Sequence, residues 1–393
     1  MKEVYILDGA RTAFTAFGGS FSTIQADELG KVTAEEAMKR SGVTPEQIDH
    51  VVYGNVIHSH TNAAYLARHI GLKAGVPKEV PALTLNRLCG SGTQAVVSSA
   101  QMIQLGEAEI VLAGGAENMS MAPYANFSSR FHQAKLGPMK FEDMLLSTLT
   151  DDYTGNGMGM TAEKLSEMYD ISRDEQDAFS ALSHERAAAA RESGRFGKEI
   201  VPFEMATRKG TLVVDKDEHI KPETTAETLG KLRPSFKKDG TVTAGNASGI
   251  NDGAASLVIA SKNAVDRHGL KPMARIVSWG ISGVDPEIMG IGPVPAIKQA
   301  LDRAGMSLEQ IDLFEVNEAF AAQYLAVEKE LGLDREKTNV NGGAIALGHP
   351  VGTSGARIVL SLAYELKERG LRYGVASLCI GGGQGIAMII EHV

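Results

Sequence analysis

Short apolar runs alternate along the chain with longer segments whose apolar residues recur at helical spacing. This alternation of strands with helices predicts an α/β fold built in layers. The expected strands are Val4–Leu7, Val51–Tyr53, Ile110–Ala113, Leu257–Ala260, Leu313–Val316, Val375–Leu378 and Ile386–Ile390. The expected helices are Ala26–Arg40, Ala63–Ala74, Ser91–Leu105, Pro295–Ala304, Glu318–Leu331 and Ser354–Arg369. Ser172 and Glu175 form a capping box that opens a further helix to about Glu192.

One segment of the chain is repeated. AMKRSGVTPEQID (37–49) aligns without gaps to ALDRAGMSLEQID (300–312), an offset of 263 with seven of 13 positions identical. Helix–turn–strand units can converge on similar caps, so this similarity alone does not establish a duplication. However, both copies continue in the same order, the first to Cys89 and the second to His349 and Cys379. We therefore expect a duplicated unit that brings Cys89 and His349 to matching helix starts.

Residues 120–247 differ in character from the sequence on either side. They are richer in methionine, polar residues and charge, with weaker periodicity. A long insertion of this kind is usually functional or has structure of its own. We expect an N-terminal half of residues 1–119 with 248–271, an inserted loop domain of residues 120–247, and a C-terminal half of residues 272–393. The methionine-rich region 118–139 is expected to make oligomer contacts or to line the pocket.

Composition excludes several classes of protein. The formal net charge of −9 argues against nonspecific binding to nucleic acid or to an anionic membrane. No apolar stretch is long enough to span a bilayer. The N-terminus enters a strand-like run at once, so we expect no signal peptide. Two cysteines in 393 residues cannot form a disulfide framework, and we therefore expect a reducing cytoplasm.

Both cysteines and one histidine lie beside glycines. Cys89 stands in LNRLCGSG (85–92), Cys379 in SLCIGGGQG (377–385), and His349 in NGGAIALGHPVGTSG (341–355). Glycine lets backbone N–H groups approach a substrate closely and face a developing negative charge. Each cysteine taken alone could be a small buried hydrophobic residue. Three such positions together favour covalent acyl chemistry.

Each of these residues has a plausible chemical role. Cys89 precedes a helical run, and a helix N-terminus lowers the pKa of a thiol and so favours a nucleophile. His349 could accept the thiol proton. Cys379 could resolve a disulfide or act as a general acid/base, and Gly381–Gly383 could supply N–H donors. Asn317, at a strand-to-helix junction, could cap the helix or hold a water in an oxyanion hole.

Several long motifs carry a family resemblance. They are DGART (8–12), NRLCGSG (86–92), AGGAENMS (113–120), KLRPSF (231–236), AGNASGINDGA (244–254), NEAFA (317–321), GGAIALGHPVGTSGARI (342–358) and CIGGGQG (379–385). Through them the chain resembles the thiolases, in particular the acetyl-CoA acetyltransferases, nearly from end to end. The resemblance implies two duplicated βαβαβαββ halves in an α-β-α-β-α arrangement, with an inserted loop domain.

The resemblance also implies an activity, the Claisen condensation of two acetyl-CoA to acetoacetyl-CoA and CoA, with the reverse thiolysis. Cys89 would be the nucleophile that carries the acyl group as a thioester. His349 would activate Cys89 and, with a water held by Asn317, bind the thioester oxygen of the second substrate. Cys379 would accept the proton, and the N–H groups of Cys89 and Gly381 would hold the oxyanion. No metal and no separate cofactor is expected, because coenzyme A is itself substrate and product.

Four residues are expected to contact acetyl-CoA or acetoacetyl-CoA by the same resemblance. Ser248 would contact the pantetheine amide, and Met158 and Phe320 would contribute to substrate binding at the acyl pocket. Lys221 would lie near the CoA phosphates, although many relatives have arginine there and a lysine in a charged stretch is commonly just solvated. Relatives are dimers or tetramers, so we expect a homo-oligomer, a dimer of dimers.

One departure affects the acyl range. Acetyl-specific members often have a histidine before the Met-Gly of the loop domain, where GNGMGMTAE (155–163) has Gly157. A broader-range 3-ketoacyl-CoA thiolase of fatty-acid β-oxidation is therefore the alternative. A decarboxylating ketosynthase typically has histidine in place of Asn317 and lacks the Cys379-type thiol. A non-catalytic CoA- or lipid-binding member would be expected to lose Cys89, His349 or Cys379.

Overall fold

A mixed sheet forms the centre of the molecule. The structure is a computed structural model that describes residues 2–132, 136–208 and 210–393. One half of the sheet has the order β1-β12-β5-β3-β4 and the other half the order β13-β16-β15-β14. The two halves of the sheet join where Tyr5 and Ile6 of β1 pair with Arg275 and Ala274 of β13. The first half comprises β1 (Val4–Arg11), β12 (Asn251–Ser261), β5 (Ile110–Asn118), β3 (His50–Gly54) and β4 (Ala82–Leu85), and the second β13 (Ala274–Gly283), β16 (Gln384–His392), β15 (Tyr373–Ile380) and β14 (Leu313–Val316).

The two halves repeat the same topology. In the first, β3 runs parallel to β5, and β5 and β1 are both antiparallel to β12. In the second, β14 runs parallel to β15, and β15 and β13 are both antiparallel to β16. β5 begins at Ile110 and β15 at Tyr373, which is the offset of 263 found in the sequence. The predicted duplication is confirmed.

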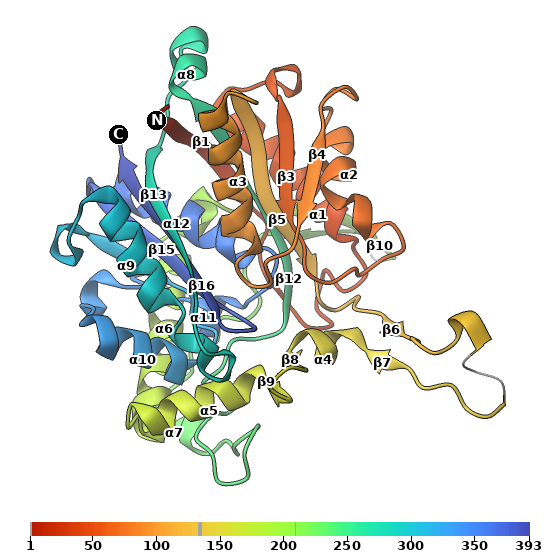
Figure 1. Ribbon diagram of the computed structural model, residues 1–393, viewed down its shortest axis with the longest axis vertical. Coiled ribbons are helices and arrows are strands. Elements are labelled where there is room, and N and C mark those ends of the chain that lie inside the picture. Colours follow the sequence, from red (N-terminus) through yellow and green to blue (C-terminus); the bar gives the residue numbers. More distant parts are fainter. Residues whose placement is uncertain (1, 133–135, 209) are drawn as a thin grey trace.

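The helices form three layers around the two half-sheets. α3 (Ser91–Leu105) and α12 (Ser354–Arg369) share one buried cluster with residues of both half-sheets, so they lie between them. α1 (Ala26–Ser41) and α2 (Leu66–Lys73) cover the outer face of the first half, and α9 (Pro293–Ala304) and α10 (Ala321–Leu331) that of the second. Figure 1 shows these outer pairs on opposite sides of the molecule. The predicted α-β-α-β-α arrangement is therefore confirmed.

The repeated segment folds the same way in both halves because its caps are the same. α1 ends at Gly42 with φ 68° and α9 at Gly305 with φ 64°, the left-handed conformation that favours glycine. A capping box then opens each short 3₁₀ helix, η1 (Pro45–Gln47) and η6 (Leu308–Gln310). The strands β3 and β14 follow these turns.

α3 and α12 approach each other through glycine. A Cβ on Gly92 would lie 2.3 Å from the backbone nitrogen of Ala356, and one on Gly355 would lie 2.4 Å from that of Thr93. The Thr93 hydroxyl donates to the Gly355 carbonyl across this contact at 3.0 Å. The first turns of the two helices therefore touch, and the loops that precede them, with Cys89 and His349, meet at one end of this layer.

Between β5 and β12 the chain forms an arm, two hairpins and several helices. The arm extends away from the sheet at β6 (Tyr124–Ala125) and β7 (Glu142–Asp143), as Figure 1 shows. The capping box of Ser172 and Glu175 opens α6 as predicted, and this helix ends at Glu192. The other elements here are η3 (Arg130–His132), α4 (Met144–Thr148), β8 (Thr150–Asp151), β9 (Asn156–Gly157), α5 (Met158–Met168), α6 (Arg173–Glu192), η4 (Phe196–Lys198), β10 (Phe203–Thr207), β11 (Gly210–Val214) and α7 (Ala226–Gly230).

Some boundaries differ from the prediction. The helix expected over 63–74 divides into η2 (Ala63–Tyr65) and α2, and the helix expected from Glu318 begins at Ala321 because Phe320 is extended at φ −146°. β13 was not expected. No described helix is long and apolar enough to cross a bilayer. The remaining elements are β2 (Thr15–Ala16), which pairs with β12, and α8 (Lys262–His268), η5 (Pro286–Ile291), η7 (Arg335–Lys337) and α11 (Ala344–Leu347).

Candidate active site

Cys89 lies in a tight turn between β4 and the start of α3. The residue before it, Leu88, has φ 46°, which is unusual for a side chain larger than asparagine and costs on the order of 1 kcal/mol or more. The Asn86 side chain supports this turn, because its Oδ1 accepts the Leu88 N–H at 2.8 Å. Ser91 closes the turn by accepting the Arg87 N–H at 2.8 Å and donating to the Leu88 carbonyl at 2.7 Å. The position of Cys89 is thus fixed by its neighbours.

Two backbone N–H groups, those of Gly381 and of Cys89 itself, interact with the Cys89 thiol. Burial nevertheless raises the pKa of the Cys89 thiol to about 11, and this effect outweighs both N–H groups. The expectation that a helix N-terminus lowers this pKa is therefore wrong: α3 begins two residues after Cys89, and burial of the thiol has the larger effect although the residue as a whole is partly exposed. The resting thiol is protonated at neutral pH and needs a base.

Cys379 lies at the end of β15, immediately before the glycine turn. Its side chain is buried, and burial followed by the charge of a neighbouring Cys89 thiolate raises its pKa. The two sulfurs are thus close enough to influence each other, and both cysteines are free thiols. Gly382 and Gly383 have φ of 77° and 80°, so this turn depends on glycine and directs the Gly381 N–H toward Cys89.

His349 and Asn317 meet in the same buried region. The Nε2 atom of His349 lies 3.5 Å from the Asn317 Nδ2, and its Nδ1 lies 2.6 Å from the Ser354 hydroxyl. Burial, and after it the positive charge of Arg357, lowers the pKa of His349 to about 3, so the imidazole is neutral. The Asn317 N–H donates to the Ser377 carbonyl of β15 at 2.9 Å, which places Asn317 beside the Cys379 strand.

Asn317 does not cap a helix. α10 begins at Ala321 with Phe320 at its N-cap position, so the capping alternative is wrong. The side chain of Asn317 is buried, and its Oδ1 has no hydrogen-bond partner among the described residues. A buried, unpartnered amide oxygen is the kind of group that binds an ordered water or a polar ligand atom.

Two supporting residues were not predicted. The buried Glu117 carboxylate accepts the N–H groups of Val56, Ile57 and Gly352 at 2.9–3.1 Å, and so ties the His349 loop to the first half. Asn251 accepts the His349 N–H at 3.0 Å. Glu117 lies in the AGGAENMS motif and Asn251 in the AGNASGINDGA motif. The motifs therefore contained both residues, but nothing in the sequence predicted their contacts.

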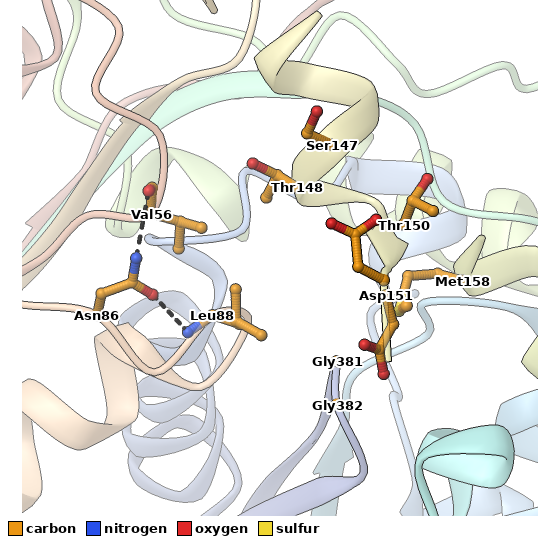
Figure 2. Close-up of a pocket in the computed structure, with 11 residues that line it drawn as sticks. Val56, Asn86, Leu88, Ser147, Thr148, Thr150, Asp151, Met158, Gly381 and Gly382 are labelled. Carbon is orange, nitrogen blue, oxygen red and sulfur yellow. Dashed lines mark hydrogen bonds between the residues drawn. The ribbon is translucent and has the colours of Figure 1, made fainter. Parts of the chain in front are cut away.

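A cavity of about 240 Å³ opens beside the Cys89 turn, where Leu88 and Gly381 line it. Figure 2 shows Val56, Asn86 and Leu88 on one side, residues of α4 and the β8–β9 hairpin on the other, and Gly381 and Gly382 at the base. Met158, the first residue of α5, also lines it and lies near Gly381. A Cβ on Gly157 would meet only the Leu149 carbonyl, at 3.8 Å, so there is open space where acetyl-specific relatives often have histidine.

The expected substrate contacts fall into two groups. Met158 and Phe320 belong to one apolar cluster with Cys379, and the Phe320 ring packs edge-on against Phe236 at 6.0 Å. Ser248 lies next to this cluster, since its N–H donates to the Ala319 carbonyl at 2.9 Å. Lys221 is exposed, and its described hydrogen bonds are made by its backbone, to the His184 ring and from the Thr224 N–H. The structure thus brings Met158, Phe320 and Ser248, but not Lys221, to the region of Cys379.

Comparison with known proteins gives a consistent family assignment. The model for the thiolase N-terminal domain matches residues 4–263, and that for the thiolase C-terminal domain matches residues 270–392. The human mitochondrial 3-ketoacyl-CoA thiolase is 53% identical over 391 residues, covering 100% of this chain and 98% of that protein. An acetyl-CoA acetyltransferase of Syntrophomonas wolfei is 48% identical, covering 99% of each chain. The crystal structure of the human enzyme has a TM-score of 0.97 at 53% identity and covers 100% of this chain and 99% of its own; it has also been solved in complex with CoA.

These relatives correct the expected location. The human, orangutan and mouse relatives, each 53% identical, are mitochondrial 3-ketoacyl-CoA thiolases, which contradicts the cytoplasmic expectation. A low cysteine count argues against an oxidising compartment, but it does not distinguish the cytoplasm from another reducing compartment.

Two family models cover almost the whole chain. The same chain brings together the Cys89 thiol, the Cys379 thiol beside it, the neutral imidazole of His349 and the N–H groups that face Cys89. The protein belongs to the thiolase family of acyltransferases.

Proposed function

We propose that this thiolase cleaves 3-ketoacyl-CoA with CoA and catalyses the reverse condensation, with acetoacetyl-CoA as its smallest substrate and longer acyl chains also accepted. The observation that carries the proposal is the convergence of the Cys89 and Gly381 N–H groups on the Cys89 sulfur, beside a cavity. Two N–H groups at that point can hold the oxygen of a tetrahedral intermediate formed on Cys89.

In the direction of cleavage, the Cys89 sulfur attacks the 3-keto carbon while its proton passes to the Nε2 of His349. Because burial favours the neutral form of both groups, proton transfer and attack are coupled, and the oxyanion is held by the N–H groups of Cys89 and Gly381. The C2–C3 bond then breaks, and its electron pair leaves as the enolate of acetyl-CoA.

The enolate oxygen is stabilised by the newly formed Nε2–H of His349 and by a water on Asn317. Cys379 gives its proton to the enolate carbon, which releases acetyl-CoA. A second CoA thiol then attacks the acyl group on Cys89 and returns a proton to Cys379, while His349 returns its proton to Cys89. The products are acetyl-CoA and an acyl-CoA two carbons shorter, and no step requires a metal or a redox cofactor.

The acyl range is proposed from Gly157 and the cavity. Gly157 directly precedes Met158, which lines the cavity, and a Cβ at position 157 would have free space around it. We take this space as room for an acyl chain longer than acetyl. The 53% identity to 3-ketoacyl-CoA thiolases supports this assignment over a strict acetyl-CoA acetyltransferase.

The test compares thiolysis of acetoacetyl-, 3-ketohexanoyl- and 3-ketodecanoyl-CoA by the wild type, Gly157→His and Cys89→Ala. We expect kcat/KM on the longer substrates to be comparable with that on acetoacetyl-CoA. Gly157→His should reduce the longer ones selectively, by about tenfold or more, because the imidazole fills the open space. A steep wild-type preference for acetoacetyl-CoA would refute the broad range, and the absence of activity on all three would refute the function.

We also propose that the protein forms a homo-oligomer through the β6–β7 arm. Phe127, Phe131 and Leu136 on the described part of this arm are 72%, 83% and 102% exposed, and such residues are normally covered by a partner. Residues 133–135 of the same region lie outside the described residues. Sedimentation should show a tetramer that becomes a dimer when the three residues are changed to serine; an unchanged oligomer would refute the role of the arm.

A further inference from the structure

The His349 ring is held at both of its nitrogen atoms. Nδ1 lies 2.6 Å from the Ser354 hydroxyl, and Nε2 faces the Asn317 amide nitrogen at 3.5 Å. Burial keeps the ring neutral, so only one of the two nitrogens carries a hydrogen. Which nitrogen carries it decides whether Nε2 can act as a base.

The Ser354 hydroxyl has one hydrogen, and its partner can be identified. The hydroxyl lies 3.0 Å from the Pro350 carbonyl, in a geometry in which it donates to this acceptor one helical turn earlier. A carbonyl oxygen can only accept, so this contact is a hydrogen bond only if the serine hydrogen is used there. The serine oxygen must then accept from the ring, which places the hydrogen of His349 on Nδ1.

The duplicated half shows the same use of a serine. Ser91 and Ser354 are 263 positions apart, and each is the first residue of its helix. The Ser91 hydroxyl donates to the Leu88 carbonyl at 2.7 Å and accepts the Arg87 N–H at 2.8 Å. In both halves, therefore, the serine gives its hydrogen to a carbonyl of the preceding turn. Ser91 also receives a hydrogen from an N–H group, and a hydrogen on Nδ1 of His349 would give Ser354 the same pair of partners.

The facing amide agrees with this assignment. Asn317 Nδ2 can only donate, so an unprotonated Nε2 is the partner that suits it. The opposite tautomer would place two N–H groups against each other at Nε2. It would also leave Nδ1 and the Pro350 carbonyl competing for the single serine hydrogen.

We propose that Ser354 is a positioning residue that fixes His349 as the Nδ1–H tautomer, with the lone pair of Nε2 free to accept the Cys89 proton. The inference rests on the proposed function for its catalytic meaning, because a base at Nε2 is needed only if Cys89 is acylated. The same Nε2, once protonated, becomes the donor to the enolate oxygen. One serine thus prepares a single atom for two successive steps.

The direct test is the tautomer itself. In protein labelled with ¹⁵N-histidine, long-range ¹H–¹⁵N spectra distinguish a protonated ring nitrogen from an unprotonated one, and the His349 signals are those missing from His349→Asn. At pH 7 we expect a protonated Nδ1 and an unprotonated Nε2. A protonated Nε2 in the wild type overturns the proposal. If the wild type gives the expected spectrum but shows no thiolysis activity, the tautomer is supported and the proposed function is refuted.

The kinetic test uses a matched pair of serines. Ser354→Ala removes the acceptor for Nδ1–H, and Ser99→Ala removes another buried helical hydroxyl that donates to a carbonyl four residues earlier, that of Ala95, at 2.7 Å. We expect Ser354→Ala to lose about 10- to 100-fold in kcat for thiolysis, with a mixture of tautomers in the spectrum. Ser99→Ala should keep its kcat and the Nδ1–H signal. An unmixed Nδ1–H signal in Ser354→Ala would overturn the role of the serine.

Discussion

Replacing Gly92 by alanine should separate the two helices that carry the catalytic loops. The new Cβ would lie 2.3 Å from the backbone nitrogen of Ala356, whereas ordinary contact begins at 3.4 Å, a deficit of 1.1 Å. The obstructing atom is backbone, so no side chain can rotate away. α3 and α12 must therefore move apart by about 1 Å at their first turns, and Cys89 moves relative to His349.

The effect on activity should exceed the effect on folding. Overpacking of this kind costs about 1–3 kcal/mol of stability, while alanine regains up to about 1 kcal/mol of helix propensity. We therefore expect a net loss of about 1–2 kcal/mol in the free energy of unfolding. A displacement of about 1 Å between a nucleophile and its base reduces the rate on the order of 100-fold.

The assay pairs urea denaturation with the initial rate of acetoacetyl-CoA thiolysis under conditions where the variant remains folded. Gly355→Ala tests the same helix contact from α12, because its Cβ would lie 2.4 Å from the Thr93 nitrogen. It should likewise lose more activity than stability. Gly197→Ala is the control, because nothing lies within 4 Å of its Cβ; kcat and stability should be unchanged. A Gly92→Ala protein that keeps more than half of the wild-type kcat would refute the argument that this helix contact positions the site.

Three further predictions concern individual groups of the site. With a pKa of about 11, the Cys89 thiol should be alkylated by iodoacetamide at a rate that rises about tenfold per pH unit from pH 7 to pH 9.5, because the thiolate fraction grows throughout this range; a plateau near pH 7 would contradict it. Asn317→Ala should lower kcat for thiolysis by about 10²- to 10³-fold through the lost enolate stabilisation, and a loss below fivefold would speak against that role. Glu117→Ala should reduce the free energy of unfolding in urea by about 3 kcal/mol or more, because three buried N–H groups lose their acceptor; Glu117→Gln, which keeps an acceptor oxygen, should lose less.

Much of the architecture follows from local sequence. α3, α12 and α6 begin at the predicted residues, because their starts are marked by glycine or by a capping box. The offset of 263, read from one short alignment, recurs at the starts of α3 and α12 and of β5 and β15. The residues that start and end a helix or strand lie within a few positions of its boundary. A single sequence is therefore enough to predict these elements.

The electrostatics of the site could not be predicted in the same way. Helix position alone suggested a lowered pKa for Cys89, but burial of the thiol raises it, and the Gly381 N–H, which acts in the lowering direction, does not compensate. The strain at Leu88, φ 46°, is likewise imposed by Asn86 and Ser91 within a turn whose sequence carries no glycine at that position. Burial depends on segments far apart in the sequence. The Leu88 conformation depends instead on local hydrogen bonds with the side chains of Asn86 and Ser91, which residue type alone does not specify.

The duplication raises the question of why the molecule has one site rather than two. At the offset of 263, Cys89 corresponds to Gly352, so the second half has no nucleophile at the matching position. The N–H of Gly352 is also not available to a substrate, because it donates to the buried Glu117 carboxylate at 2.9 Å. A Cβ at position 352 would lie 2.4 Å from that carboxylate, so a cysteine there would force the Glu117 side chain to shift. The Glu117 carboxylate of the first half thus occupies the Gly352 N–H of the second half. The N–H at the matching position of the first half, that of Cys89, is the one proposed to bind an oxyanion. The contact between Glu117 and Gly352 anchors the His349 loop to the first half, and the two unequal copies together form a single site.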